Sequence, residues 1–340
     1  MRHTYGKPFD PFRIGRSLSK IRGTMEASAD VAARFAPTLS AYGDVPYCRV
    51  CGCRESHPFA VMHDVYEYRE CDACGSLFLS KLPDVSKMYS NQDALNDGSY
   101  IDESVWMNRV DMIARPKVDF ICDAMRDAGK PVKDSLWVDI GAGGGEALYS
   151  ARERGFVVRA IESDPNECAF LKKKGIALIS AFVDPDHPNV EIEAAVAEAA
   201  VVSLFNVAEH LTFPRAYFSY LTKRMKQGSF LVVEVPRHPA LATLANITSQ
   251  NHVYRHLSPP GHLQLFSEKG LAACVGDAFE PLASWEFGQG FIDLVIDAMV
   301  LAGREEDAFY RDIIGMGNEM QKVVDERHFA DQMLVVMRKA

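Results

Sequence analysis

Residues 116–340 alternate between short apolar runs and amphipathic stretches. The runs are rich in valine, isoleucine and leucine and predict buried strands. Between them, apolar residues recur at helical spacing and the helices end at glycines, as in Pro165–Lys174 and from Pro214 to Gly228. The predicted strands are SLWVDI, FVVRAIE, IALISAF, AVVSLFN, SFLVVEV, PLASWEFG and QMLVVMRK. We therefore expect an α/β domain with a doubly wound, mostly parallel, seven-stranded sheet covered by helices on both faces.

The first 115 residues do not follow this alternation and predict three smaller segments. Residues 1–45 form a basic arm, in which Thr24–Phe35 has the apolar spacing of a short helix. Residues 46–80 combine clustered cysteines with short β-like runs, and residues 81–115 are polar and irregular, as in a connector or cap. A basic, acid-poor start is also typical of a mitochondrial transit peptide, so a loosely packed arm and such a peptide are both retained.

The composition is that of a globular protein, with 48% apolar and 24% charged residues in 340. No apolar run is long enough to span a bilayer, and the N-terminus lacks the apolar segment of a secretory signal. We therefore expect a cytoplasmic protein without a membrane partner. The formal charge is −9, from 37 basic and 46 acidic residues. Because proteins that grip a phosphate backbone are usually basic, this balance disfavours nucleic acid and favours a small-molecule substrate.

Four cysteines have the spacing of a structural zinc site. Cys48 and Cys51 form one C-x2-C pair, and Cys71 and Cys74 form another after nineteen intervening residues. Four thiolates complete a tetrahedron around zinc and leave no position open for chemistry. We therefore expect a zinc ribbon over residues 46–80, with metal-free thiols as one alternative. A site that uses another nearby side chain is the second alternative, and the candidates are Cys53, His57 and His63.

A glycine-rich turn follows the first strand of the α/β domain. Its order is Asp139-x-Gly141-x-Gly143-x-Gly145, and a dinucleotide-binding fingerprint would place a glycine where Glu146 stands. Glycines allow the backbone to turn sharply and its N–H groups to approach a ligand. Glu162 ends the second strand, where a carboxylate is placed to accept hydrogen bonds from ribose hydroxyls.

This loop and acid resemble motif I of the class I S-adenosylmethionine-dependent methyltransferases. The later stretch NVAEHLTFPRAYFSYLTKRMKQGSFLVVEVP resembles the fourth strand, helix and fifth strand of the same superfamily. The resemblance implies a Rossmann-like domain that binds S-adenosylmethionine. It places the methionine part on Gly141 and Gly143, the ribose on Glu162, and Asn206 beneath the cofactor.

Two further segments resemble particular members of this superfamily. The segments YEYRECDACGSLFLS and MYS are similar to an N-terminal zinc-binding module of some small-molecule and sugar methyltransferases, where the module is thought to cap the substrate side. The Glu209-His210 pair matches members that often act on sugars, although those relatives often carry a tyrosine where this chain has Val207. The implied acceptor is a hydroxyl of a sugar, nucleotide-sugar or polysaccharide precursor.

Half of the ten histidines lie between residues 210 and 262. His210 follows strand four at the carboxyl end of the sheet, where substrates bind in open α/β folds. A neutral imidazole is the natural base for a hydroxyl, so we rank His210 first, then His262 and His256, with Glu209 beside them. Alternatively these histidines are structural, or Asn206, Glu209 and His210 help to hold a divalent ion, as in a ubiquinone-pathway O-methyltransferase with a similar segment.

Three other functions compete with this hypothesis. A non-catalytic module could recruit partners through the ribbon, an RNA or protein methyltransferase could use the same cofactor fold, and an oxidoreductase could bind a nicotinamide. The glycine spacing disfavours the oxidoreductase. The acidic balance, and the absence of an NPPY-like tetrapeptide after strand four, disfavour the RNA or protein methyltransferase.

Overall fold

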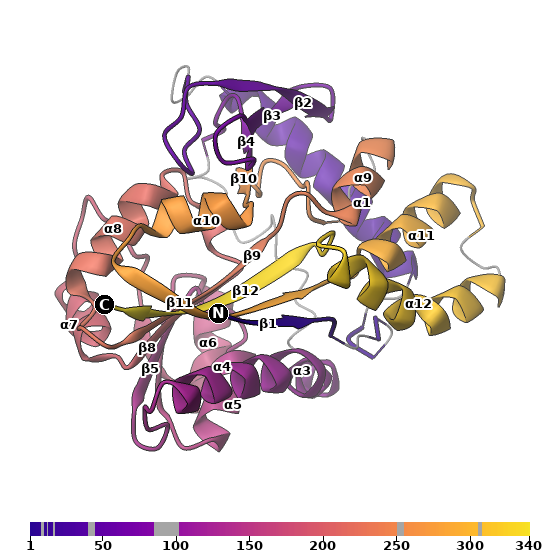
Figure 1. Ribbon diagram of the computed structural model, residues 1–340. Helices are drawn as coiled ribbons and strands as arrows, with labels where there is room; N and C mark the ends of the chain where they lie inside the picture. Colours follow the sequence, from indigo (N-terminus) through magenta and orange to yellow (C-terminus); the bar gives the residue numbers. More distant parts are fainter. Residues whose placement is uncertain are drawn as a thin grey trace.

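The computed structural model describes residues 1–7, 10–11, 13–15, 18–39, 45–84, 102–249, 255–304 and 308–340. One sheet runs through the centre of the molecule. A smaller sheet lies at the top of the view in Figure 1, on the side of the helices that cover one face of the central sheet. Of the predicted connector, residues 85–101 lie outside the described residues, and so do His252 and Tyr254 of the histidine-rich segment.

The central sheet has eight strands in the order β1-β11-β12-β9-β8-β5-β6-β7. Only β12 runs antiparallel to its neighbours. All seven predicted strands are present, which confirms the doubly wound, mostly parallel α/β sheet. Their bounds are β5 Leu136–Ile140, β6 Val157–Glu162, β7 Ala177–Ser180, β8 Val201–Phe205, β9 Phe230–Pro236, β11 Phe279–Phe287 and β12 Gln332–Lys339.

The eighth strand, β1 at Arg2–Tyr5, comes from the predicted basic arm and pairs in parallel with β11 at the sheet edge. Four residues with polar side chains are too short to show an alternating pattern, so the sequence did not predict this strand. The helix predicted in the arm is present and longer, as α1 at Leu18–Phe35. Its Ile21 and Met25 pack on α11 (Gly290–Leu301), and its Ala32 and Phe35 pack on the smaller sheet.

Helices cover both faces of the central sheet. On one face lie α7 (Val190–Glu198), α8 (Pro214–Arg224) and α10 (Glu268–Val275), and on the other α4 (Arg115–Asp127) and α5 (Glu146–Glu153) (Figure 1). Apolar residues that alternate along β5 divide between the two layers, because Val138 packs with the first group and Trp137 with the second. The other helices are α3 Glu103–Arg109, α6 Pro165–Lys173, α9 Leu241–Ser249 and α12 Ala308–Glu326, with a π turn at Val110–Ala114.

The smaller sheet is antiparallel, in the order β10-β4-β3-β2. Strands β2 (Ser56–Met62), β3 (Tyr66–Cys71) and β4 (Leu77–Leu79) belong to the cysteine segment, whereas β10 (Gln264–Leu265) comes from the far half of the chain. Arg49 also donates to the carbonyl of Leu263, and Tyr68 donates to that of His262. The cysteine segment is therefore built into the α/β domain.

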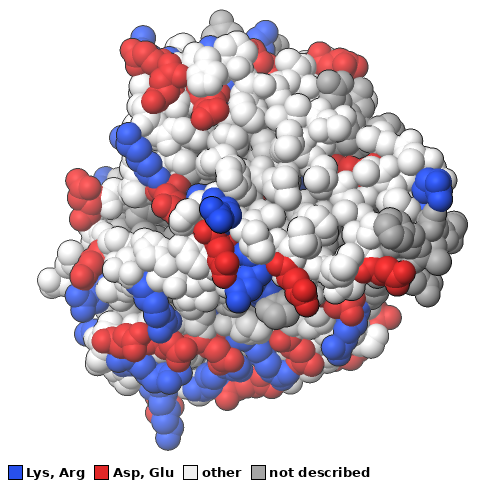
Figure 2. Space-filling model, turned by 45° about the vertical axis from the view of Figure 1, so that its right-hand side comes forward, with Lys and Arg blue, Asp and Glu red and all other residues white. Residues whose placement is uncertain are grey.

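The surface carries its charges unevenly. Lys, Arg, Asp and Glu side chains alternate along the lower rim in Figure 2, which α3, α4 and α5 form, whereas much of the upper surface in that view is uncharged. Opposite charges on the rim pair with each other, as Arg115 does with Glu153 and Arg154 with Asp119. In the part of the chain that the structure describes, no helix combines the length and hydropathy that crossing a membrane requires.

Candidate active site

The glycine loop joins β5 to α5 at the carboxyl edge of the sheet. Gly141, Gly143 and Gly145 have φ angles of 68°, 54° and 73°, in the region that favours glycine. A Cβ on Gly141 would lie 2.7 Å from Val207 Cγ2, and one on Gly145 would lie 2.5 Å from Leu171 Cδ2. At Gly143 the nearest such atom is 4.0 Å away, so that glycine faces open space. The loop thus packs on both sides and leaves its middle accessible.

Glu162 stands at the end of β6 and binds the loop. Its carboxylate accepts hydrogen bonds from the backbone N–H groups of Gly143 (2.9 Å), Ser163 (2.7 Å) and Asp164 (2.9 Å). The side chain is partly exposed. The carboxylate therefore lies beside the loop, where the sequence predicted a ribose-binding acid, and that role stays a prediction.

Helix α3, within the segment predicted as a connector, closes over the same loop. The Trp106 indole N–H donates to the Gly144 carbonyl at 2.9 Å, and the Trp106 side chain is fully buried. Arg109 Nε donates to Glu146 Oε1 at 2.6 Å. Neither Trp106 nor Arg109 has a sequence signal for this role, because its partner lies 38 or 37 positions away.

Asp139 lies beneath the loop at the end of β5. It is 2% exposed, and its Oδ1 accepts a 2.5 Å hydrogen bond from Ser203 Oγ on the adjacent strand β8. Burial raises the pKa of Asp139 to about 7, and the charge of Glu162 adds to this effect while the Ser203 hydrogen bond opposes it. Asp139 therefore changes its charge near neutral pH.

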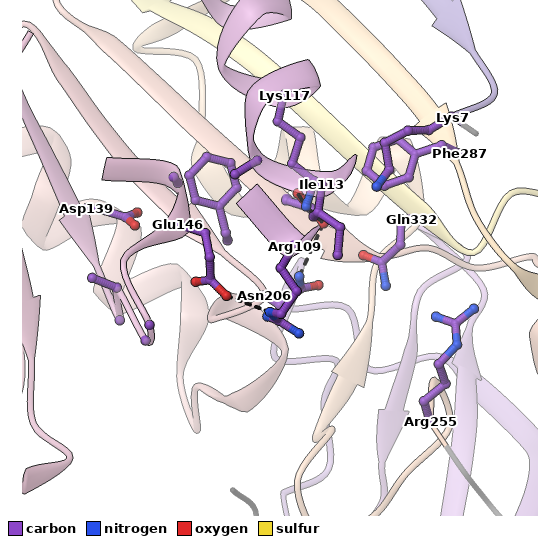
Figure 3. A pocket seen from close by; sticks show the side chains of 18 of the residues that line it. Lys7, Arg109, Ile113, Lys117, Asp139, Glu146, Asn206, Arg255, Phe287 and Gln332 are labelled. Carbon is purple, nitrogen blue, oxygen red and sulfur yellow. Dashed lines mark hydrogen bonds and ion pairs between the residues drawn. The ribbon is translucent and has the colours of Figure 1, made fainter. Parts of the chain in front are cut away.

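A cavity of about 390 Å³ extends from the glycine loop across the carboxyl edge of the sheet. At one end, the cofactor half, it is lined by Asp139, Gly141–Gly144, Arg109 and Glu146. At the other end, the acceptor half, it is lined by Lys7, Arg255, Phe287, Gly288, Gln289 and Gln332. Figure 3 shows Asp139 and Glu146 on one side of this space and Lys7, Phe287, Gln332 and Arg255 on the other.

A buried ion pair lies between the two halves. Lys117 of α4 approaches Glu234 of β9 at 2.6 Å, and the two side chains are 9% and 2% exposed. Asn206 Nδ2 donates to Glu234 Oε1 at 3.2 Å, and the backbone of Asn206 has a φ of 54° (Figure 3). The pair thereby holds Asn206 at the end of β8. Of the two ions, only Glu234 had a sequence signal, as a charged residue inside the apolar run SFLVVEV.

The predicted catalytic residues gather elsewhere, between the cavity edge and the smaller sheet. A ligand atom from each of Glu209, His210 and His262 lies within 4.8 Å of the others, and the His210 and His262 rings are 5.0 Å apart. None of the three lines the cavity described above. His256 does not join them through its ring, because it is 1% exposed and its Nε2 bonds Thr243 Oγ1.

The histidine rings of this cluster are neutral near pH 7. Burial lowers the pKa of His262 to about 3, with a further contribution from His210, and burial also lowers the pKa of His210. Each ring has Nδ1 beside a backbone carbonyl, Gly261 O for His210 and His256 O for His262. A carbonyl only accepts, so Nδ1 carries the proton and Nε2 keeps a lone pair. Glu209 below them is fully buried, which raises its pKa well above the usual range.

The four spaced cysteines converge on one point. Their sulfur atoms all lie within 4.8 Å of one another, with Cys48 and Cys74 at 3.9 Å and Cys51 and Cys71 at 3.5 Å. A tetrahedral zinc with bonds of about 2.3 Å places its sulfur ligands about 3.8 Å apart, so the donor set fits zinc. The alternative ligands are not in this group, since Cys53 bonds Glu55 and His57 bonds Asp72.

Comparison with known proteins finds a family match for part of the chain. Residues 115–278 match the model of a methyltransferase domain family. Over 145 residues the chain is 28% identical to the mitochondrial ubiquinone biosynthesis O-methyltransferase of Schizosaccharomyces pombe. That match covers 41% of this chain and 51% of the relative, so the chain spans about half the length of that protein.

Among solved structures, the chain resembles a putative sarcosine dimethylglycine methyltransferase from Galdieria sulphuraria, with 10% identity, a TM-score of 0.43 and coverage of 71% of this chain and 88% of the other. It also resembles the magnesium protoporphyrin IX methyltransferase of Synechocystis, with 11% identity, a TM-score of 0.44 and coverage of 76% and 94%. Residues 115–278 therefore match a methyltransferase domain family, and the order and direction of the strands give this part of the chain a Rossmann-like α/β fold.

Proposed function

We propose that the protein transfers a methyl group from S-adenosylmethionine to a small polar acceptor, with a hydroxyl of a sugar, nucleotide-sugar or polysaccharide precursor as the leading acceptor class. The observation that carries this proposal is the single cavity that joins the glycine loop to a half lined by polar side chains. A cofactor at the loop and an acceptor in the other half would meet beside Asn206. The relative from S. pombe, an O-methyltransferase by name, supports oxygen as the accepting atom.

The residues of the cofactor half suit this role. The open face of Gly143 would receive the methionine part, with Gly141 and Gly145 fixing the turn. Glu162, which lies beside the loop but does not line the cavity, would bind the ribose. Asp139 and Asn206 would complete the floor. When bound, S-adenosylmethionine supplies a methyl group already activated by its sulfonium. The chain's own task is therefore to hold an acceptor in line with that methyl group and to exclude water.

Transfer to a hydroxyl also requires a base for its proton. His210 remains our candidate, because its side chain is 28% exposed and its Nδ1 carries the proton beside the Gly261 carbonyl, so that the basic lone pair of the neutral ring is on Nε2. His262 lies against it, Glu209 lies below, and His256 orients His262 through its backbone carbonyl. Because His210 does not line the cavity, this proposal requires the acceptor hydroxyl to extend from the cavity to the His210 cluster, where Nε2 of His210 takes its proton as the acceptor oxygen forms its bond to carbon.

The same cluster supports a second mechanism. Glu209 is fully buried, and neither of its carboxylate oxygens has a hydrogen-bond partner among the described residues. Two Nε2 lone pairs and this carboxylate form a donor set that a divalent ion would satisfy. In that case the ion, rather than a histidine, would lower the pKa of the acceptor hydroxyl.

The cysteine ribbon would hold one structural zinc ion through Cys48, Cys51, Cys71 and Cys74. Four thiolates close the coordination sphere, so this zinc would stabilise the fold and take no part in methyl transfer. The smaller sheet lies next to the His210 cluster, which supports a cap on the acceptor side. The cytoplasmic location stays a prediction.

Titration calorimetry with S-adenosylhomocysteine tests the proposal. We expect the unaltered chain to bind, Gly143→Arg to lose binding because its side chain fills the open face of the loop, and Glu162→Ala to bind more weakly. Absence of binding by the unaltered chain would overturn the proposed function. Release of S-adenosylhomocysteine with a panel of hydroxylated sugars and phenols then identifies the acceptor, and its dependence on His210→Ala or on added divalent ions separates the two mechanisms.

A further inference from the structure

The acceptor half of the cavity is assembled from segments that lie far apart in the sequence. Lys7 follows β1, Arg255 precedes β10, Gln289 stands before α11, and Gln332 begins β12. All four line the same space. Four separate segments of the chain therefore meet at one end of the sheet and together form the lining of one site.

The side chains in this half are hydrogen-bond donors and cations. Lys7 and Arg255 carry positive charge, and Gln289 and Gln332 carry amides. Among the described residues that line this half, none has a carboxylate, whereas the cofactor half contains Asp139 and Glu146. Gln332 has a buried amide oxygen without a hydrogen-bond partner in the described part of the chain, and this oxygen can accept from a hydroxyl of the ligand but not bind an anionic oxygen.

Arg255 is held rigidly from behind. Its Nη2 contacts the carboxylates of Asp293, at 2.6 Å, and Asp331. Asp331 Oδ1 in turn accepts hydrogen bonds from the backbone N–H groups of Gln289 (2.7 Å) and Gly290 (3.0 Å). The negative charge of Asp331 is therefore stabilised by the N-terminus of α11 as well as by Arg255. The Arg255 Nε has no hydrogen-bond partner among the described residues. In Figure 3 the guanidinium points toward Gln332.

Lys7 approaches the same space from the opposite side. Its Nζ lies 5.1 Å from the centre of the Phe287 ring, and Lys117 Nζ lies 5.5 Å from the same ring. Figure 3 shows Lys7 beside Phe287 at the upper end of this half and Arg255 at the lower end. A group bound between them would meet the Lys7 ammonium on one side, the Arg255 guanidinium, which is also paired with Asp293 and Asp331, on the other, and one aromatic face.

We propose that the methyl acceptor carries an anionic oxygen group, a phosphate or a carboxylate, which binds between Lys7 and Arg255 in the acceptor half of the cavity. The inference rests on the proposed function, because it assigns the other half to the cofactor. Anionic oxygens take charge-assisted hydrogen bonds from both residue types, and a bound group of this kind would satisfy Arg255 Nε. Its place would orient the rest of the acceptor toward Asn206 and the cofactor half.

The test uses the full chain saturated with S-adenosylhomocysteine, so that the glycine loop and the start of α5 cannot take up the anion. Inorganic phosphate and malonate are titrated in separate calorimetric experiments at constant ionic strength maintained with chloride. We expect millimolar binding of at least one of them. Phosphate alone indicates a phosphorylated acceptor, and malonate alone indicates a carboxylated one. Binding of both supports the shared anionic chemistry.

Variants locate the binding. Lys7→Met should weaken it roughly tenfold, the loss expected for one charge-assisted hydrogen bond. Lys133→Met is the matched control, since Lys133 is exposed and precedes β5 at the amino edge of the sheet. Arg255→Lys keeps a cation but loses the second donor, and should also weaken binding.

The outcomes separate the two hypotheses. If the unaltered chain does not bind S-adenosylhomocysteine, the proposed function is wrong and this inference falls with it. If it binds S-adenosylhomocysteine but neither anion, or if Lys7→Met and Arg255→Lys both bind the anion as the unaltered chain does, the anionic acceptor is wrong and the methyltransferase proposal stands.

Discussion

Gly145 ends the glycine loop in a left-handed conformation with two neighbours pressed against it. A Cβ at this position would lie 2.5 Å from Leu171 Cδ2 and 2.8 Å from Ile176 Cδ1. Gly129 has almost the same backbone, with a φ of 70°, but no atom within 4 Å of a built Cβ. The two glycines therefore separate the effect of backbone conformation from the effect of packing.

We expect Gly129→Ala to lower the free energy of unfolding by about 1 kcal/mol, the cost of a left-handed alanine. Gly145→Ala should lower it by about 1–3 kcal/mol more, because Leu171 and Ile176 must move, and should weaken binding of S-adenosylhomocysteine. Urea unfolding and calorimetry measure both quantities. Equal destabilisation by the two variants would contradict the packing argument.

Asp139 predicts a pH dependence of stability. Its pKa of about 7 in the folded state is above the ordinary value of about 3.9, so between these values the folded state binds more protons than the unfolded state. Stability from this group therefore falls as pH rises from about 4 to 7. Asp139→Asn removes the titration, and relative to the unaltered chain it should gain about 2–4 kcal/mol between pH 4 and pH 8. A difference that is constant with pH in urea unfolding would show that Asp139 keeps its charge.

Helix α3 acts on the loop as an element, through one indole hydrogen bond. Trp106→Phe keeps an aromatic ring but loses the bond to Gly144, which should weaken binding of S-adenosylhomocysteine roughly fivefold, the equivalent of about 1 kcal/mol. Trp285→Phe is the matched control, because Trp285 donates an equivalent bond to the Gly6 carbonyl beside β1. The control should lose stability without losing affinity. Equal affinities for both variants in calorimetry would show that α3 does not organise the loop.

We expect the metal content of the protein to depend on the four thiols of the cluster and not on Cys53, the fifth cysteine of the ribbon. The purified chain should contain one zinc ion by elemental analysis. Cys71→Ser should lose it, since the Cys71 sulfur faces that of Cys51 at 3.5 Å. Cys53→Ser should keep it, because Cys53 bonds Glu55 outside the cluster. Retention of zinc by Cys71→Ser, or its loss from Cys53→Ser, would contradict the proposed ligand set.

At the scale of the whole molecule, the ribbon and the α/β domain should unfold together. The two share a sheet through β10, and Cys48, Cys74 and Phe78 pack in one apolar cluster with Leu271 of α10. Removal of zinc should therefore lower the temperature of one common transition rather than add an early, separate one. Differential scanning calorimetry of the chain with and without a chelator checks this, and two resolved transitions would disprove it.

Local patterns predicted most of the architecture. The seven strands, the glycine loop, the converging cysteines and the position of Glu162 each depend on residues close together in the chain, so spacing alone indicated them. Strand β1 and strand β10 are too short for a periodic signal, and each forms only by pairing with a distant segment.

The segment of residues 288–290 could be expected near the site from the sequence, but the rest of the acceptor half and the buried ion pair escaped prediction for the same reason as β1 and β10. Lys117 and Glu234 stand 117 positions apart, and Lys7 meets Arg255 only because β1 completes the sheet edge. Counting histidines pointed to His256, but its orientation is set by Thr243 in a buried contact that sequence spacing does not reveal. The roles of the predicted catalytic and cofactor-binding residues stay predictions.

The shared sheet also has a consequence for how the chain is made. Phe78 pairs with Gln264, and Arg2–Tyr5 pairs with residues 283–286. Strands β4 and β1, which are synthesised early, therefore cannot form these pairs until β10 and β11 have been synthesised. Until then the edge of β4 is unpaired and open to association with other chains. Early zinc loading during synthesis would hold the ribbon in shape through this interval. Cells starved of zinc should therefore accumulate the protein in aggregates that form during its synthesis, even if the folded protein tolerates metal loss.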